Sequence, residues 1–395
     1  MNQLTNEQTN MQQLTIPIRS KLPRTGSSIF SVMSALANQH NAINLSQGFP
    51  NFDMPSELIE LTYKAMQKGL NQYAPMAGVY ALREAIAQKA KALYHADISP
   101  DENITITSGA TQAIYTAITT FVQEDEEVII FEPAYDSYIP AIQVAGGKPI
   151  YIPLNAPDYR IPWDMVKKVI TTRTRMIIIN SPHNPTGTTL KEDDLQELKK
   201  IVSGSDMLIL SDEVYEHITF DGEKHKSLLN YPELMHRTLV CGSFGKTFHN
   251  TGWKMGFCIA PSYLMKEFQK VHQFMVFSVN TPIQYALAEY LQNPNSYMGL
   301  SAFYQKKRDY FLELMQGSRF KLQPAKGSYF QLADFSAISD EKDTDFVQRL
   351  TKEIGVAAIP VSVFYNNHLD EKIIRFCFAK TDETLEQAAK LLCKV

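Results

Sequence analysis

The chain has 395 residues, more than one hydrophobic core usually supports, so two domains are expected. Its composition, 44% hydrophobic and 20% charged, is that of a globular protein, and a net charge of −4 argues against nucleic acid or an anionic membrane as partner. No apolar stretch reaches transmembrane length, so we expect small-molecule partners.

The N-terminal residues 1–19 predict a leader before the folded domains. They are rich in Asn, Gln and Thr and lack the apolar block and early basic residue of a secretory signal. The scattered cysteines have no metal-type spacing and are typical of reduced thiols. We therefore expect a cytoplasmic protein without a metal site.

Short apolar runs alternate with helical patterns between about residues 100 and 260. Continuous hydrophobicity in such runs is typical of strands buried on both faces of a parallel sheet, and the alternation favours α/β layering. The predicted strands are 104–107, 127–131, 175–180, 207–212, 238–243 and 256–261, and predicted helices include 111–122 and 191–202.

Beyond about residue 285 the pattern changes to long helical segments (283–316), strands at 328–335 and 373–379, and a final helix from about 382. This pattern predicts a smaller α+β domain. We expect it to comprise residues 20–50 with 286–395, and the large domain to comprise 51–285 with a mostly parallel sheet.

Several predicted strands end in polar clusters, and ligands of open α/β sheets bind at the carboxyl ends of strands. In "ITSGATQAIY", Gly109, Ala110 and Thr111 open a helix whose free N–H groups favour an anion, although a plain helix cap fits too. In "NSPHNPTG", Asn184 is either a fixed amide before Pro185 or part of an ordinary loop.

Charged and phenolic groups follow two further strands. Asp212 ends an apolar strand in "LSDEVYEH", with Tyr215 close behind, and a buried carboxylate there needs a cation, several donors or a structural salt bridge. In "GSFGKTFHNTGWKMG", Ser243 and Lys254 could hold a phosphate dianion. Burial and Lys254 would then lower the pKa of Lys246, which suits a nucleophilic amine better than a surface lysine.

Arg375 lies inside the apolar strand "KIIRFCFAK", where an arginine usually binds a carboxylate. That carboxylate could belong to the core or to a substrate. Together, the phosphate cradle, carboxylate, phenol, amide, amine and arginine describe a pyridoxal phosphate site that acts on an amino acid.

At this point the sequence resembles the fold-type I, class I pyridoxal-phosphate-dependent aminotransferases. The resemblance covers nearly the whole chain from "KLPRTGSSIFSVMSALA" onward. It is carried, in family order, by "NLSQGFPNF", "NQYAPMAGVYALR", "NSPHNPTG", "SDEVYEH" and "SFGKTFHNTGWKMG". Within the class, the chain is most similar to the methionine and kynurenine aminotransferase group, and more to its methionine members.

The resemblance implies roles for individual residues. Lys246 would bind the cofactor covalently and act as general base, Asp212 would pair with the pyridinium nitrogen, and Tyr215 and Asn184 would contact the phenolic oxygen of the ring. Other implied cofactor contacts are Tyr135, which would stack on the ring, and the phosphate ligands Gly109, Ala110, Thr111, Ser243, Lys254 and Tyr73. Tyr73 would come from the other subunit of a homodimer with shared active sites. Arg375, Asn184 and the backbone of Gly48 would bind the substrate α-carboxylate.

The resemblance also implies a ping-pong reaction between amino acids and 2-keto acids. An apolar pocket of Ile29, Phe30, Tyr73, Tyr135 and Phe277 would favour methionine and aromatic amino acids over aspartate. Kynurenine aminotransferase or cysteine-conjugate β-lyase activity is the alternative. A transcription regulator is disfavoured, because too few residues precede Lys21 for a DNA-binding domain.

Two positions depart from the family pattern. Val361 stands in "PVS", where many relatives have Pro-Gly-Ser, so either the backbone differs there or the glycine never needed a positive φ. Val361 would also add bulk near the expected pocket. Ser278 follows Phe277 where kynurenine enzymes often carry histidine, which weakens the kynurenine assignment.

Overall fold

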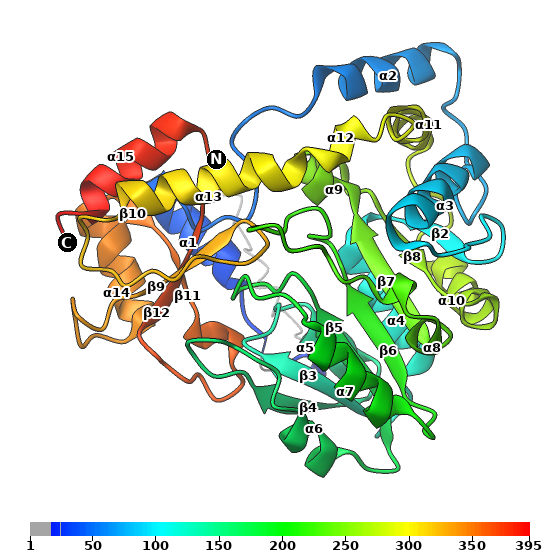
Figure 1. Ribbon diagram of the computed structural model, residues 1–395, viewed down its shortest axis with the longest axis horizontal. Helices are drawn as coiled ribbons and strands as arrows, with labels where there is room; N and C mark the ends of the chain where they lie inside the picture. Colours follow the sequence, from blue (N-terminus) through cyan, green and yellow to red (C-terminus); the bar gives the residue numbers. More distant parts are fainter. Residues whose placement is uncertain (1–16, 24) are drawn as a thin grey trace, which may run out of the picture.

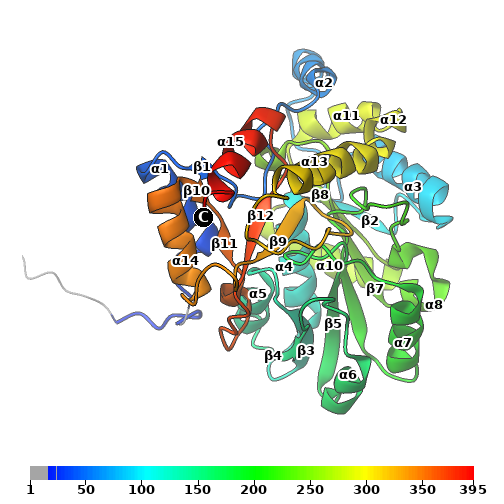
Figure 2. The same cartoon turned by 60° about the vertical axis from the view of Figure 1, so that its left-hand side comes forward.

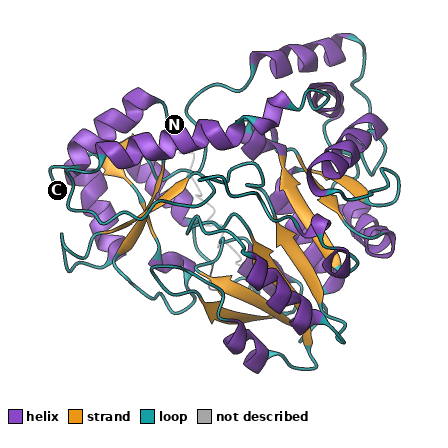
Figure 3. Cartoon of the chain, in the orientation of Figure 1, coloured by secondary structure: helices purple, strands orange, loops and turns teal. Residues whose placement is uncertain are grey.

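The computed structural model describes residues 17–23 and 25–395, so most of the predicted leader lies outside the described residues. The described chain forms one seven-stranded sheet and two smaller sheets, with helices around them (Figures 1 and 3). Among the described residues, no helix combines the length and apolar character needed to cross a membrane.

The seven-stranded sheet has the order β2-β8-β7-β6-β5-β3-β4. Its strands are β2 (Ile104–Thr107), β3 (Glu127–Glu132), β4 (Lys148–Pro153), β5 (Thr174–Asn180), β6 (Leu208–Asp212), β7 (Thr238–Ser243) and β8 (Gly256–Ile259). The strand predictions are confirmed to within a few residues. The edge strand β4 was missed, because it is partly exposed and lacks a continuous apolar run.

The sheet is mostly parallel, as expected, and the exception is β8, which runs antiparallel to both its neighbours, β2 and β7. Only a short segment separates the end of β7 at Ser243 from the start of β8 at Gly256. It holds the four-residue helix α9 (Phe244–Thr247) and a 3-10 turn, too little for a helical crossover to a parallel strand. The apolar sequence of β8 correctly predicted a strand that is buried on both faces. Burial, however, does not specify the direction of a strand.

Alternating residues of the sheet point into two different cores. Val128 and Ile130 pack with α4 (Gly109–Phe121), α5 (Tyr138–Val144) and α10 (Ser262–Met275) on one face. Ile129 and Phe131 point to the opposite face. That face is covered by α3 (Tyr80–Tyr94), α6 (Trp163–Val169), α7 (Glu192–Val202) and α8 (Pro232–Met235). Helices on both faces explain the continuous apolar runs, because every side chain of a central strand is buried.

The smaller sheets lie beside the large one. One is antiparallel, with the order β11-β12-β9, and the other is the parallel pair β1-β10. These strands are β1 (Ile43–Asn44), β9 (Phe330–Asp334), β10 (Val356–Ala357), β11 (Ile359–Pro360) and β12 (Ile373–Cys377). Figure 2 shows α1 (Ile29–Gln39), α14 (Asp343–Arg349) and α15 (Asp382–Leu392) gathered around them, away from α7 and α8.

The predicted helical stretch 283–316 divides into α11 (Thr281–Tyr290), α12 (Asn295–Met298) and α13 (Leu300–Leu314), and α2 (Ser56–Gln67) packs on α11. Pairing of β1 with β10 brings the N-terminal segment next to the C-terminal strands, at Ile43 and Val356. The proposed domain boundaries at residues 50 and 285 stay a prediction.

Candidate active site

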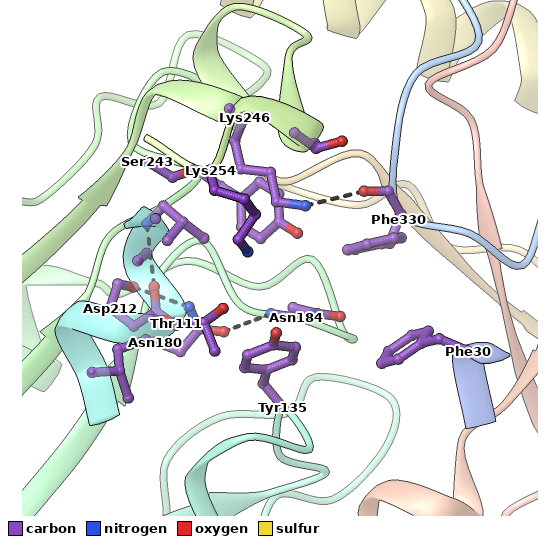
Figure 4. A pocket seen from close by; sticks show the side chains of 18 of the residues that line it. Phe30, Thr111, Tyr135, Asn180, Asn184, Asp212, Ser243, Lys246, Lys254 and Phe330 are labelled. Atoms are coloured by element: carbon purple, nitrogen blue, oxygen red, sulfur yellow. Dashed lines mark hydrogen bonds between the residues drawn. The ribbon is translucent and has the colours of Figure 1, made fainter. Parts of the chain in front are cut away.

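A cavity of about 250 Å³ opens where β5, β6 and β7 end, between the large sheet and the small one (Figure 4). Most of the predicted site residues line it: Gly48, Gly109, Ala110, Thr111, Tyr135, Asn184, Asp212, Tyr215, Ser243, Lys246, Lys254 and Arg375. Strands that are separated in sequence end at one sheet edge, which is why the fold collects these groups.

One end of the cavity is built for an anion. It contains the first turn of α4, whose N–H groups have no partner within the helix, together with Ser243, Thr251 and Lys254. Gly109 has a φ of 76°, and a Cβ there would lie 3.3 Å from Lys254 Cε. Gly256 also permits a close approach, because its Cβ would lie 2.7 Å from the backbone nitrogen of Ala110. The glycines therefore bring lysine, hydroxyl and helix terminus together.

Asp212 is buried at the end of β6. Its carboxylate accepts hydrogen bonds from the Tyr138 hydroxyl at 2.5 Å and from the backbone N–H of Val214 at 3.4 Å. No ion pair involves it among residues 17–23 and 25–395, so the structural salt bridge is not formed. Burial raises its pKa to about 6. A cation that enters the cavity would stabilise the charged carboxylate.

Asn180 joins two predicted site residues, Asp212 and Asn184, although no sequence pattern singles it out. Its side-chain amide donates to the Asp212 carbonyl at 3.0 Å and accepts from the Asn184 N–H at 2.8 Å. The end of β5 thereby fixes the end of β6 and the loop that follows β5. Figure 4 shows Asn180 beside Asp212 and Thr111.

The Lys246 amine reaches into the cavity from the turn after β7. It donates hydrogen bonds to the Gly48 carbonyl at 3.0 Å and to the Tyr329 hydroxyl oxygen at 2.8 Å. Burial lowers its pKa to about 8, and the nearby charges of Arg375 and Lys254 act in the same direction. A substantial fraction of the amine is therefore neutral near pH 8, the state that reacts as a nucleophile or base.

Arg375 on β12 is completely buried and has no carboxylate partner in the described part of the chain. Its guanidinium donates to Asn184 Oδ1 at 2.6 Å and to the Ser46 carbonyl at 3.1 Å, while its Nε has no hydrogen-bond partner there. The ring of Phe330 lies 3.8 Å from the guanidinium carbon. Burial lowers its pKa to about 10, so the group stays charged at neutral pH. A buried guanidinium with an unused donor is suited to an incoming carboxylate.

Comparison of the sequence and the structure with known proteins agrees with this geometry. The family model of the class I and II aminotransferases matches residues 40–392. The methionine aminotransferase of Escherichia coli is 49% identical and covers 95% of this chain and 97% of its own. The chain belongs to the class I and II aminotransferases.

Other relatives of this aminotransferase fall in the same family. The kynurenine–oxoglutarate transaminase of Dictyostelium discoideum is 34% identical, and the match covers 94% of each chain. The crystal structure of YbdL from Escherichia coli, described as having a methionine aminotransferase function, superposes with a TM-score of 0.95 at 48% identity. That match covers 96% of this chain and all of the other. The fold-type I α/β architecture of the aminotransferase is thus shown independently.

Only part of the expected apolar pocket lies on the cavity wall of the single aminotransferase chain. Phe30 and Tyr135 line it, whereas Ile29 and Phe277 do not. Successive helix residues point about 100° apart, so Ile29 turns away where Phe30 on α1 faces the cavity. Phe277 packs edge-on against Tyr73, at 5.3 Å between ring centroids, on the surface of the chain. Tyr73 is 81% exposed in the single chain, and its contribution to a partner's site stays a prediction.

The structure also decides how the backbone accommodates Val361. This residue has a φ of −82° and a ψ of −24°, so the position requires no glycine. Its side chain is buried but is not part of the cavity wall. The expected bulk in the pocket is therefore not found.

Sequence reasoning assigned no role to several residues of the wall: Gln47, Ile114, Asn180, Val214, Gly245, Thr251, Met255 and Phe330. It also missed Tyr329, the hydrogen-bond partner of Lys246. In "KGSYFQL", Tyr329 and Phe330 have the pattern of strand core, and only the hydrogen bond of Tyr329 to Lys246 and the place of Phe330 on the cavity wall reveal their contact with the site. The described residues contain no cluster of three or more His, Cys, Asp or Glu side chains that could hold a metal ion.

Proposed function

We propose that this aminotransferase uses pyridoxal phosphate to transfer the amino group of methionine, and of other apolar or aromatic amino acids, to a 2-keto acid. The observation that carries the proposal is the buried Arg375, which has charge, an unused donor and no carboxylate partner among the described residues. Amino and keto acids share the carboxylate that such a guanidinium binds.

The residues present fit the cofactor. The α4 terminus, Ser243 and Lys254 form a cradle for a phosphate dianion, and the uncompensated Asp212 suits a ring nitrogen that carries a proton. In this proposal Lys246 binds the cofactor covalently, Tyr215 and Asn184 contact its phenolic oxygen and Tyr135 stacks on its ring. When bound, pyridoxal phosphate supplies a conjugated system that can accept an electron pair from the substrate Cα.

The side chains of the protein then have distinct tasks. Arg375 and Asn184 bind the substrate carboxylate, and this contact fixes the direction of the Cα–H bond. Lys246, with its lowered pKa, takes the proton from Cα when its amine is free and later returns it. Asp212 keeps a positive charge on the ring nitrogen. The aromatic walls exclude water from these groups.

Three features support the proposed substrate preference. Phe30, Tyr135 and Phe330 line the cavity, and Figure 4 shows Phe30 and Phe330 away from Asp212 and Ser243. The cations on the described wall are Lys246, Lys254 and Arg375, all already assigned, so a second carboxylate of aspartate would have no partner. The Escherichia coli relative is a methionine aminotransferase. Kynurenine transamination or β-lyase activity is the second candidate, favoured by the kynurenine transaminase among the relatives.

A homodimer with shared sites, in the cytoplasm, completes the proposal. The exposed aromatic pair Tyr73 and Phe277 supports it, because apolar side chains exposed together favour an interface.

A half-reaction screen tests the proposed function. The purified enzyme with bound cofactor is mixed with methionine, phenylalanine, kynurenine or aspartate, and the loss of the cofactor absorbance is followed. We expect methionine to react fastest and aspartate slowest, and Lys246→Ala to lose the borohydride-reducible link to the cofactor. A fast reaction with aspartate would contradict the preference. Pyruvate released from a cysteine conjugate without keto acid would identify β-lyase activity.

A further inference from the structure

Tyr329 is a buried phenol whose hydroxyl lies at the reactive amine. Its oxygen accepts a hydrogen bond from Lys246 Nζ at 2.8 Å, and its own proton goes to the Gly48 carbonyl oxygen at 2.5 Å. The same carbonyl accepts a second hydrogen bond from Lys246 at 3.0 Å. Amine, phenol and carbonyl thus form a closed triangle, contributed by the turn after β7, the segment before β9 and the loop after β1.

The phenol cannot leave this position easily. Its side chain is fully buried, and its ring packs against Tyr215 at 5.1 Å, Phe330 at 5.0 Å and Tyr304 at 5.7 Å between centroids. Gly48 is also fixed, because a Cβ there would lie 2.8 Å from the Phe330 ring. Both acceptors of the Lys246 amine are therefore rigid.

We propose that Tyr329 is a positioning residue that holds the amine of Lys246, whenever it is not bound to the cofactor, with its lone pair directed at the substrate. This inference rests on the proposed function. A neutral amine has two N–H bonds and one lone pair. The two N–H groups donate to the Gly48 carbonyl oxygen and to the Tyr329 hydroxyl oxygen. The Tyr329 hydroxyl donates its own proton to the Gly48 carbonyl and therefore cannot donate to the amine, so the lone pair of the amine stays free.

The geometry serves the proton transfer directly. When the amine removes the proton, the Cα–H bond breaks and an N–H bond forms. The electron pair of the broken bond would be accepted by the conjugated system that the cofactor supplies when bound. The ammonium that results keeps its hydrogen bonds to Gly48 and Tyr329 and carries the transferred proton on the third bond. Neither acceptor has to reorient between the two charge states, which lowers the cost of the transfer.

Tyr329→Phe tests the proposal, because it removes the hydroxyl and keeps the packed ring. We expect the half-reaction rate with methionine to fall about tenfold. This factor corresponds to roughly 1.4 kcal/mol in activation free energy, which is the size of one lost hydrogen bond. The concentration of methionine at half-maximal rate should stay unchanged. The isotope effect with Cα-deuterated methionine should rise, because the proton transfer becomes slower relative to other steps.

A second readout does not depend on turnover. Tyr329 accepts a hydrogen bond from the ammonium, so its loss should lower the pKa of Lys246. The pH at which cofactor-free protein captures pyridoxal phosphate at half its maximal rate should then fall by about half a pH unit. Tyr304→Phe is the matched control, since it removes a neighbouring buried hydroxyl that is bonded to His249 at 2.9 Å.

Outcomes separate the two proposals. A Tyr329→Phe enzyme with wild-type rate, isotope effect and capture profile overturns the role of Tyr329, as does an equal loss in Tyr304→Phe. A wild-type protein that fails to capture the cofactor, or does not react with methionine, overturns the proposed function instead.

Discussion

At the scale of single residues, burial sets the chemistry of the site. Arg375, Asp212 and Lys246 are ordinary ionisable side chains, and none of them forms an ion pair with another described residue. Burial lowers the pKa of Lys246 and Arg375 and raises that of Asp212. The charges of these side chains are therefore available to a cofactor and a substrate that carry charges of opposite sign.

Arg375→Ala should mainly raise the KM for both the amino acid and the keto acid. Two charge-assisted hydrogen bonds are lost, so we expect a rise of roughly 100-fold with a smaller change in kcat. Steady-state kinetics with both substrates measure it. Arg375→Lys keeps the charge but loses the planar guanidinium group. Its KM values should therefore lie between those of the wild type and those of Arg375→Ala. Unchanged KM values in both variants would place the carboxylate elsewhere.

Asp212 gives the cofactor-free protein a defined pH dependence. Its pKa rises from 3.8 to about 6 on folding, so the folded protein binds this proton more tightly than the unfolded chain. The associated stability, roughly 3 kcal/mol, is present below pH 3.8 and is lost as the pH rises through about 6. Asp212→Asn should therefore stabilise the cofactor-free protein at pH 8 relative to the wild type, and much less at pH 4.5.

Urea unfolding of the two cofactor-free proteins at both pH values measures this difference. In the enzyme with bound cofactor, the same substitution should lower kcat far more than it weakens cofactor binding, because the charge partner of the ring nitrogen is lost. A stability difference that is independent of pH would contradict the assigned pKa, and equal losses in kcat and binding would contradict the role.

At the scale of elements, close backbone approach builds the anion end of the cavity. The start of α4 lies directly against Gly256 at the beginning of β8, where a Cβ would meet the backbone nitrogen of Ala110 at 2.7 Å. The short antiparallel connection from β7 to β8 also returns Lys254 to the terminus of α4. The positions of the α4 terminus and of Lys254 therefore both depend on the contact between α4 and Gly256.

Gly256→Ala should push α4 away from β8 and weaken the binding of pyridoxal phosphate at least tenfold, with a loss of folding free energy of about 1–3 kcal/mol. A fluorescence titration of cofactor-free protein gives the dissociation constant. Gly252→Ala is the control, because it lies in the same loop and a Cβ there would meet no atom within 4 Å. Equal affinities in the two variants would show that this contact does not support the phosphate site.

At the scale of the whole molecule, the proposed homodimer makes a sharp prediction. If Tyr73 serves the site of its partner, then a hybrid of one Lys246→Ala chain and one Tyr73→Ala chain contains one intact site. That site has Lys246 from one chain and Tyr73 from the other, while the second site lacks both. Purified hybrid should therefore show about half the activity per dimer of the wild type at limiting cofactor.

Differently tagged chains, expressed together and purified by both tags, provide the hybrid, and the two parent homodimers are the controls. A hybrid no more active than expected from the parents would place Tyr73 in the site of its own chain or outside it. Light scattering of the wild type tests the dimer itself.

Sequence patterns alone predicted the α/β class, the central strands and the residues with strong chemical signatures. The reason is local: strand burial leaves continuous apolar runs, and the polar clusters follow where those strands end, as at Asn184, Asp212 and Ser243. These side chains are recognisable because their types are costly inside a protein unless a ligand or partner compensates them.

Tertiary structure alone decided what depends on distance between remote segments. The direction of β8, the lack of an ion pair at Arg375 in the described chain, and the contact of Tyr329 with Lys246 each depend on parts of the chain that no local pattern connects. Tyr329 has the sequence signature of a core aromatic residue, and it is one. The role proposed for it follows only from the position of its hydroxyl, between Lys246 and the Gly48 carbonyl.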